Sequence, residues 1–210
     1  MLAAPTHPER PLIVGIAGGI AAGKSAVASA FASLGFLVSD SDRSVRAALG
    51  REDVRSTLVE WWGPGILDPS GEVARSRVAE IVFAEPAERR RLESLVHPIV
   101  HAERRDLVDR AAAVGAPGVV IDAPLLFEAG VDAECDAVVF VDAPIEVRLE
   151  RTRSRGWDAA ELERREAAQM PLTEKRARSQ FVVRNSGSEM AELEQQVRRV
   201  YDALRADEGP

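Results

Sequence analysis

The 210-residue chain carries a net charge of −7, with 46% hydrophobic and 29% charged residues, a balance typical of a globular protein with a sizeable core. The acidic balance argues against a general nucleic-acid or membrane-surface binder, and no run approaches the ~20 apolar residues of a membrane span. A single cysteine, Cys135, excludes an internal disulfide framework and a cysteine-based zinc site. We expect residues 1–10 to form a loose leader, without the apolar run of a signal peptide, and the protein to be cytoplasmic.

The first predicted element is a strand, a loop and a helix over about residues 12–34. Leu12–Ile16 is a short apolar run typical of a buried parallel strand. The next stretch, Gly18–Ser25, reads glycine, four residues, then Gly-Lys-Ser, which is the phosphate-binding loop pattern. Apolar residues then recur at helical spacing as far as Leu34. This order suits a polyphosphate, because loop N–H groups and the positive end of the helix converge on it.

The loop pattern assigns roles to individual residues. Lys24 is expected to reach the β- and γ-phosphates of ATP, and the Ser25 hydroxyl to hold Mg²⁺. Only two of the 27 basic residues are lysines, so a lysine here fits a role that needs a compact ammonium charge. The alternative, a glycine-rich turn, is disfavoured by the flanking strand and helix. The predicted ATP-binding residues are Gly19, Ile20, Ala21, Ala22, Gly23, Lys24, Ser25 and Ala26.

Two carboxylates follow the second predicted strand, Phe36–Val38. Parallel strands end at one edge of a sheet, so Asp40 and Asp42 should lie near the phosphate loop. Either could take the proton of an attacking hydroxyl or order Mg²⁺. The alternative is a helix N-cap. We expect Asp40 to be functional and leave Asp42 open between the two interpretations.

A helical region follows the second strand. Residues 43–61 and Val73–Phe83 each read as a helix, and residues 86–114 read as a long arginine-rich helix. Pro98 is expected to break or kink this last helix. Its neighbour His97, as a lone histidine, is more often a packed or capping residue than a catalyst.

Three further apolar runs predict strands that alternate with helices. Such alternation predicts an α/β fold, a parallel sheet covered on both faces. Asp122 ends one of these strands, where a magnesium-ordering carboxylate belongs. Pro-Leu-Leu follows it closely, instead of the Asp-x-x-Gly of a GTPase switch, and Asn-Lys-x-Asp is missing from the chain, which weighs against a GTPase. The predicted strands are Val119–Asp122, Val138–Val141 and Phe181–Val183, and the helices are Pro144–Arg155, one opening at Asp158, and 188–205.

A cluster of arginines lies after the fourth strand. Arg151 and Arg155 are four residues apart and share a helix face. Arginine clamps stabilise the charge on a phosphoryl group in transfer, and helices that carry them often form a mobile lid. The alternative is a solvated surface, which suits most of these arginines taken singly. The cluster comprises Arg148, Arg151, Arg153, Arg155, Arg164 and Arg165.

An ordered set of short motifs accompanies the phosphate loop. The motifs are Ser39-Asp40-Ser41-Asp42, Gly71 to Arg75, Val82-Phe83, Leu95-Val96-His97-Pro98, Pro124-Leu125-Leu126-Phe127-Glu128, Ala168-Gln169-Met170 and Asn185-Ser186-Gly187. Together they resemble the dephospho-CoA kinase family over nearly the whole chain, whereas the loop alone is shared by many kinases. The resemblance implies a single P-loop NTPase-type kinase domain of residues 1–210, with a helical substrate-binding lobe at about 43–114 and a lid at about 148–178.

The resemblance also implies the reaction and its residues. The family transfers the γ-phosphate of ATP to the ribose 3′-hydroxyl of dephospho-CoA, with Mg²⁺, and needs no nucleic acid or membrane. Three departures stand out: Ala26 where the family usually has Thr, Arg148 where it usually has Gln, and an altered segment 179–184 before Asn185. The implied roles are catalysis by Asp40, Lys24 and Arg151; substrate binding by Asp40, Arg75, His97 and Leu125; adenine contact near Asn185; and metal binding by Ser25 and Asp122.

Two other functions stay open. One is another small-molecule or nucleoside monophosphate kinase of the same fold, which a substrate screen would separate. The other is a non-catalytic nucleotide-sensing module, which would bind ATP without turnover. The oligomeric state is left open by the sequence.

Overall fold

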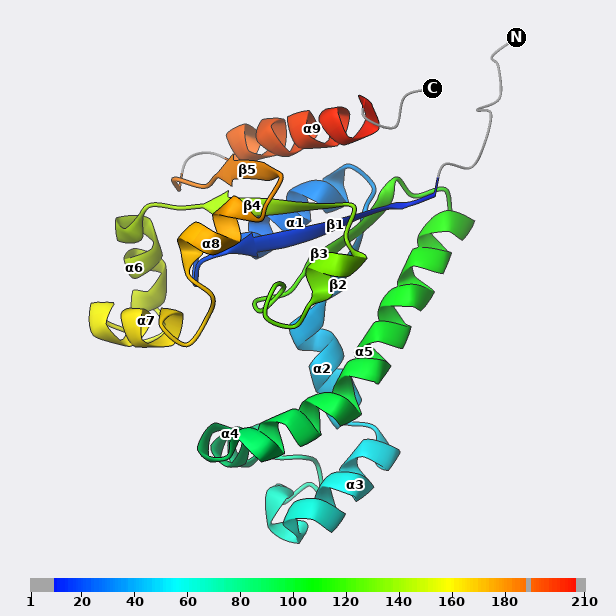
Figure 1. Ribbon diagram of the computed structural model, residues 1–210, viewed down its shortest axis with the longest axis vertical. Helices are drawn as coiled ribbons and strands as arrows, with labels where there is room; N and C mark the ends of the chain where they lie inside the picture. The colour runs from blue at the N-terminus through cyan, green and yellow to red at the C-terminus, as the bar shows by residue number, and fades with distance from the viewer. Residues whose placement is uncertain (1–9, 188–189, 207–210) are drawn as a thin grey trace. The chain divides into compact units, whose positions relative to one another are not determined.

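The computed structural model describes residues 10–187 and 190–206, and it divides the chain into two compact units (Figure 1). One unit comprises Met1–Asp40 and Leu107–Pro210, and the other comprises Ser41–Asp106. The predicted leader, apart from Arg10, and the predicted start of the last helix lie outside the described residues.

The first unit is built on a five-stranded parallel sheet in the order β2-β3-β1-β4-β5. The predicted α/β fold is therefore confirmed, and so is each predicted strand. The second strand extends two residues beyond the prediction, so that Asp40 is its last residue. The strands are β1 (Leu12–Gly18), β2 (Leu37–Asp40), β3 (Gly118–Asp122), β4 (Ala137–Asp142) and β5 (Phe181–Arg184).

Helices cover both faces of this sheet, which is why its central strands are apolar runs without polar alternation. Val14 and Ile16 of β1 pack in one core cluster with α1 and α9. Ile13 and Ala17, which point to the opposite face, pack in a second cluster with the end of α5 and with α8. The helices named here are α1 (Lys24–Ser33), α5 (Pro86–Ala113), α8 (Leu172–Ala177) and α9 (Met190–Ala206).

Two shorter helices, α6 (Ile145–Arg153) and α7 (Ala159–Glu166), follow β4. Asp158 caps α7, because its Oδ1 accepts a hydrogen bond of 2.8 Å from the Glu161 N–H. The sequence predicted a helix opening at Asp158, with a capping box formed by Asp158 and Glu161, but it did not predict α8 as a separate helix. Before β4, Val131–Glu134 forms one turn of 3₁₀ helix.

The second unit is helical. The single helix predicted over 43–61 and the predicted break at Pro98 are wrong, whereas a kink at Pro98 stays a prediction. The stretch predicted as one helix over 43–61 is two helices, because the chain turns at Gly50 and Arg51. Pro98 does not break α5, since Val96 and Val100 on either side of it are buried in the core of this unit and hold the helix in place. The elements here are α2 (Ser41–Leu49), α3 (Glu52–Trp62), a 3₁₀ turn (Pro64–Ile66), α4 (Arg75–Ala84) and most of α5.

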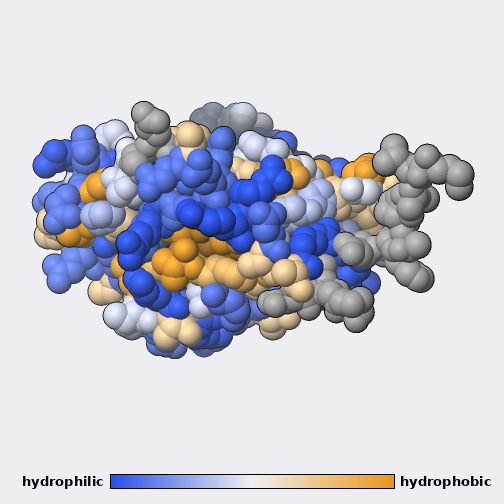
Figure 2. All heavy atoms as spheres, turned by 90° about the horizontal axis from the view of Figure 1, so that it is seen from above, coloured by the Kyte–Doolittle hydropathy of each residue, from blue (hydrophilic) through white to orange (hydrophobic). Residues whose placement is uncertain are grey.

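The C-terminal helix α9 shows how the sheet is covered. It buries one stripe of side chains, Leu193, Val197, Val200 and Leu204, and most of its other residues are exposed or partly buried. Figure 2 looks down on this side and shows a mainly hydrophilic surface with a smaller apolar area. Within residues 10–187 and 190–206, the structure contains no helix that is both long and apolar enough to cross a membrane.

The pairing of β1 with β3 generates a first prediction. A Cβ at Gly118 would lie 2.3 Å from the Leu12 carbonyl oxygen and 2.6 Å from Phe36 Cε1. Gly118→Ala must push these groups apart, so we expect it to lower the free energy of unfolding by about 1–3 kcal/mol. Gly65→Ala is the matched control, because a Cβ there meets nothing within 4 Å. Equal stability of the two variants in urea denaturation would contradict the close approach of the two strands.

Candidate functional site

The carboxyl ends of the strands gather most of the candidate residues at one edge of the sheet. The loop begins at Gly18, where β1 ends. Asp40 and Asp122, the last residues of β2 and β3, are paired in register. Asn185 directly follows β5, and its backbone N–H donates to the Asp142 carbonyl at the end of β4. In open parallel sheets, ligands bind beyond this edge.

The phosphate loop is curled tightly before it enters α1. Gly23 has a φ of 91°, and Ala21, with a φ of 59°, adopts the left-handed conformation that non-glycine residues rarely take. A Cβ at Gly23 would lie 2.1 Å from Asn185 Nδ2, so only glycine fits. Gly23 is also the N-cap of α1 and has no side chain to satisfy the N–H groups of the first turn. These groups suit an anion.

Lys24 lies over the loop backbone. Its Nζ donates to the carbonyl oxygens of Gly18 and Gly19, at 3.2 and 3.0 Å. An ammonium group has three donors on a flexible stem. It can therefore exchange backbone carbonyls for the more strongly charged oxygens of a bound phosphate.

Ser25 and Asp122, which lie far apart in the sequence, meet below the loop. The Ser25 hydroxyl donates to Asp122 Oδ2 at 2.8 Å. Hydroxyl and carboxylate oxygens are ligands that Mg²⁺ accepts. Among the described residues, no group of three or more His, Cys, Asp or Glu side chains could hold a metal ion. One hydroxyl and one carboxylate would leave most of the shell of such an ion to phosphate oxygens and water, which is usual for Mg²⁺.

Arg151 of α6 and Asn185 hold the carbonyl side of the loop. Arg151 Nη1 donates to the carbonyl oxygens of Ala21 and Ala22, both at 3.1 Å, and its Nη2 donates to Asn185 Oδ1 at 3.0 Å. Asn185 Nδ2 donates to the Ala22 carbonyl at 2.9 Å. Both residues, which the sequence singled out separately, thus act on the same few peptide groups.

Glu166, which the sequence did not single out, contacts the N–H side of the loop. Its Oε1 accepts a hydrogen bond of 3.1 Å from the Ile20 N–H, and it also accepts one from Arg148 Nη1. Arg148 is only 7% exposed. The one signal in the sequence was the departure from Gln at position 148, which placed a positive charge there without showing its partner.

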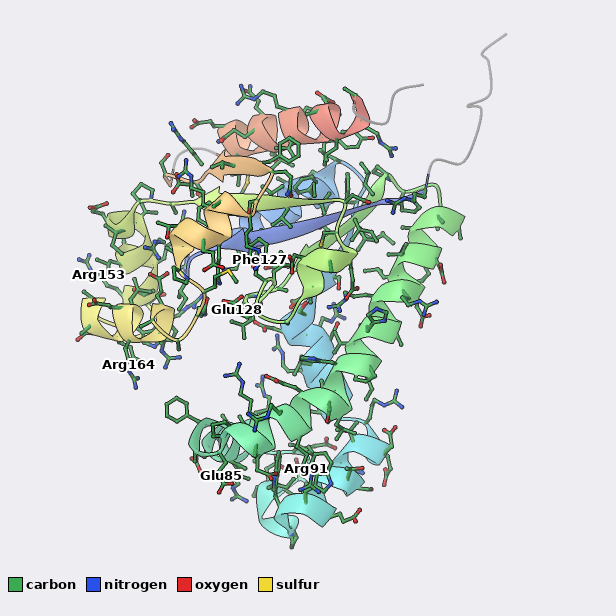
Figure 3. All side chains as sticks on the ribbon, in the orientation of Figure 1. Glu85, Arg91, Phe127, Glu128, Arg153 and Arg164 are labelled. Atoms are coloured by element: carbon green, nitrogen blue, oxygen red, sulfur yellow. The ribbon has the colours of Figure 1, made fainter. Side chains whose placement is uncertain are left out.

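A second ion pair that the sequence missed lies between α8 and the segment after β3. Lys175, only 1% exposed, donates to Glu128 Oε1 at 2.9 Å and to Gln169 Oε1 at 3.0 Å. Glu128, labelled in Figure 3, also accepts from the Met170 N–H at 2.9 Å. Partial burial of Glu128 opposes its ionisation, but the bonds from Lys175 and Met170 outweigh this and hold the pKa of the carboxyl below its ordinary value.

Several arginines of the cluster lie away from the loop. Arg153 and Arg164 lie on the outer sides of α6 and α7 (Figure 3) and are exposed. Arg164 and Arg165 both pair with Glu161 on their own helix. A solvated surface, the alternative weighed above, describes these arginines well.

The remaining candidates are placed as follows. Arg75 is the exposed first residue of α4, and His97 is exposed within α5, both in the unit Ser41–Asp106. Asp42 lies in the first turn of α2, where a carboxylate stabilises the positive end of the helix. Leu125 is half-buried in the segment after β3. Roles for these residues in a reaction remain predictions.

Comparisons with known proteins agree with one another. The family model for dephospho-CoA kinase matches residues 12–200. A dephospho-CoA kinase of Anaeromyxobacter dehalogenans is 40% identical over 199 residues, which cover 94% of each chain. Another, from Deinococcus radiodurans, is 41% identical over 184 residues, or 87% of this chain and 86% of that relative.

One solved structure extends this agreement to the fold. The crystal structure of TT1252 from Thermus thermophilus matches with a TM-score of 0.78 and 36% identity, over 93% of this chain and 98% of that one. The chain therefore belongs to the dephospho-CoA kinase family.

The pair of buried Lys175 and partly exposed Glu128 leads to a prediction about stability. Lys175→Met should lower the free energy of unfolding at pH 7 by about 1–3 kcal/mol, because it leaves the Glu128 carboxylate and Gln169 Oε1 without their donor. The double variant Lys175→Met/Glu128→Gln is the control and should recover part of this loss.

The same pair predicts how stability depends on pH. The pKa of Glu128 is lower in the folded chain than its ordinary value of 4.5, so its stabilisation is complete above that pH and is lost as the pH falls through the folded-state pKa. Urea denaturation of wild type and Lys175→Met from pH 7 downward would measure this. If the two proteins differed by the same amount at every pH, the carboxylate would have no part in the effect.

Proposed function

We propose that this member of the dephospho-CoA kinase family transfers the γ-phosphoryl group of ATP to the ribose 3′-hydroxyl of dephospho-CoA, giving coenzyme A and ADP. The observation that carries the proposal is the register of β2 with β3. It sets Asp40 beside Asp122, whose carboxylate accepts the hydroxyl of Ser25 in the phosphate loop. The end of β2, which carries Asp40, therefore lies near the loop that would bind the polyphosphate.

We assign ATP binding to the phosphate loop, residues Gly19 to Ala26. Its N–H groups and the first turn of α1 would bind the phosphates. Lys24 would leave the carbonyl oxygens of Gly18 and Gly19 and donate to the β- and γ-phosphates. Asn185, held against the loop, would lie near the adenine, as the resemblance implies.

Ser25 and Asp122 would hold Mg²⁺ together with phosphate oxygens, Ser25 directly and Asp122 by ordering its ligands. Bound there, the ion would neutralise charge on the β- and γ-phosphates. Arg151 would add positive charge behind the loop, and we assign it to stabilising the phosphoryl group in transfer.

Asp40 is assigned as the general base. A ribose hydroxyl is a weak nucleophile at neutral pH, so its orientation toward the γ-phosphorus matters most. The exposed Asp40 carboxylate would hold that hydroxyl and take its proton while the new O–P bond forms and the bond to the ADP oxygen breaks. The proton ends on Asp40 and the electron pair on ADP.

The dephospho-CoA site is assigned by resemblance to Arg75, His97 and Leu125, besides Asp40. Arg75 suits a phosphate of the acceptor, since a guanidinium binds phosphate oxygens in pairs. We further propose that the helices over about 43–114 act as the substrate lobe, and that residues 148–178 act as a lid over the nucleotide.

Lys24→Ala tests the nucleotide site. It should abolish most turnover while leaving the fold intact, because the ammonium group contacts loop carbonyls at the surface of the site and not the core. Turnover is measured by coupled release of ADP with dephospho-CoA as acceptor, and folding by circular dichroism. Normal turnover in this variant would contradict the assignment of the loop.

Asp40→Asn tests the base. We expect it to bind ATP and dephospho-CoA normally but to lose a factor of about 10²–10⁴ in kcat, the range typical of general-base catalysis. Asp42→Asn is the matched control and should stay close to wild type. Phosphorus NMR of the wild-type product should show the new phosphate on the ribose 3′-oxygen.

Other outcomes separate the alternatives. A normal Asp40→Asn beside an inactive Asp42→Asn would move the base to Asp42. Release of ADP with a nucleoside monophosphate or shikimate, but not with dephospho-CoA, would indicate a different kinase. ATP binding without turnover on any acceptor would indicate a nucleotide sensor.

A further inference from the structure

Glu166 occupies a backbone donor of the phosphate loop. Its Oε1 accepts the Ile20 N–H at 3.1 Å. A Cβ added at Gly19 would lie 2.9 Å from this same oxygen and 2.6 Å from Arg148 Nη1. The carboxylate and the guanidinium therefore rest directly on the loop backbone, on the side that carries the N–H groups.

We propose that Glu166 is an anionic plug, a carboxylate that stands in for a phosphate oxygen on the Ile20 N–H while the site holds no nucleotide. Each backbone N–H is a single donor, and a carboxylate oxygen and a phosphoryl oxygen are both anionic acceptors of it. The nucleotide must therefore displace Glu166 before its phosphate can bind this group. The inference rests on the nucleotide binding proposed above.

Arg148 is the group that makes the exchange favourable. Its side chain is 9% exposed and pairs with Glu166. Its Nε is buried and, among the residues that the structure describes, has no hydrogen-bond partner. A buried guanidinium with an unsatisfied donor is costly. An incoming phosphate offers more acceptor oxygens than one carboxylate does, so Arg148 would pass from Glu166 to the phosphate.

The helix that carries Glu166 is weakly anchored. α7 has eight residues, Glu166 is its last, and Leu162 is its one buried residue. An element that buries so little apolar surface moves at low free-energy cost. Displacement of Glu166 would release α7 from the loop, which links nucleotide binding to movement of the proposed lid.

Arg148 is one of the departures from the family pattern noted above. The resemblance above has Gln at position 148, and a neutral amide could not compensate the charge of Glu166. The plug should make the loop more selective, because an anion must interact strongly enough to replace the carboxylate. A polyphosphate achieves this through several oxygens at once, whereas inorganic phosphate has fewer contacts to offer.

Isothermal titration of ATP into the full chain, without dephospho-CoA, tests the proposal. If Glu166 blocks the loop in about nine of ten free molecules, Glu166→Ala should tighten the apparent Kd about tenfold. Glu163→Ala, an exposed carboxylate on the same helix, is the matched control and should bind like wild type. Arg148→Gln should weaken binding, since Glu166 would then face the phosphates without its cation.

Three outcomes decide the matter. An unchanged or weaker affinity in Glu166→Ala, with wild-type binding intact, would overturn the plug and leave Glu166 as a fixed support of the loop. Failure of the wild-type protein to bind ATP would overturn the proposed function instead. If Glu166→Ala does not fold, Glu166→Gln decides, because it keeps the shape but loses the charge and should still tighten binding.

Discussion

The conformation of the phosphate loop depends on hydrogen bonds that the protein itself donates to the loop's carbonyl oxygens, while a bound phosphate would accept hydrogen bonds from its N–H groups. Its carbonyl oxygens are satisfied by the protein itself, through Lys24, Arg151 and the Asn185 amide. These bonds fix the loop while the Ala22 N–H closes a turn on the Gly19 carbonyl and the Ile20 N–H donates to Glu166. The left-handed Ala21 is a local cost of this arrangement, and Asn185 leaves no room for a side chain at position 23.

The architecture of the first unit brings together the side chains that bind the loop carbonyls. The donors reach it from separate places: Lys24 from the start of α1, Arg151 from α6 and Asn185 from the end of β5. Only a parallel sheet buried on both faces brings these points together at one edge. The apolar cores on the two faces of the sheet therefore have a functional consequence, because a shift of β1, β4 or β5 would move Lys24, Arg151 or Asn185 away from a loop carbonyl.

The sequence predicted what is local and missed what is long-range. The loop, the five strands and the Asp158 cap each have a signature within a few residues, and each is present. Ser25 and Asp122 could both be assigned to magnesium because Ser25 follows the loop lysine at the start of α1 and Asp122 ends a strand of a parallel sheet. The contact of Ile20 with Glu166 spans 146 residues, and no periodicity reports such a distance. The split at Gly50 was missed although a glycine is a local helix-ending signal. The continuity of α5 through Pro98 was missed because tertiary packing, here the burial of Val96 and Val100, overrides local preference.

Two ion pairs, Lys175–Glu128 and Arg148–Glu166, differ in how completely their hydrogen-bonding groups are satisfied. The first suits a structural role, and the second suits the exchange proposed above. Lys175 shares its donors between Glu128 and Gln169, and Glu128 also accepts the Met170 N–H, so moving Glu128 away would take an acceptor from the buried Lys175 and from Met170 at once. Arg148 has a buried donor still unsatisfied among the described residues, and its partner Glu166 sits on a loop N–H that an anion can claim. On the proposal above, exchange would satisfy the second arrangement, whereas separating Lys175 from Glu128 would only remove bonds from the first. Burial alone therefore does not distinguish a structural pair from an exchangeable one; the number of donors left unsatisfied does.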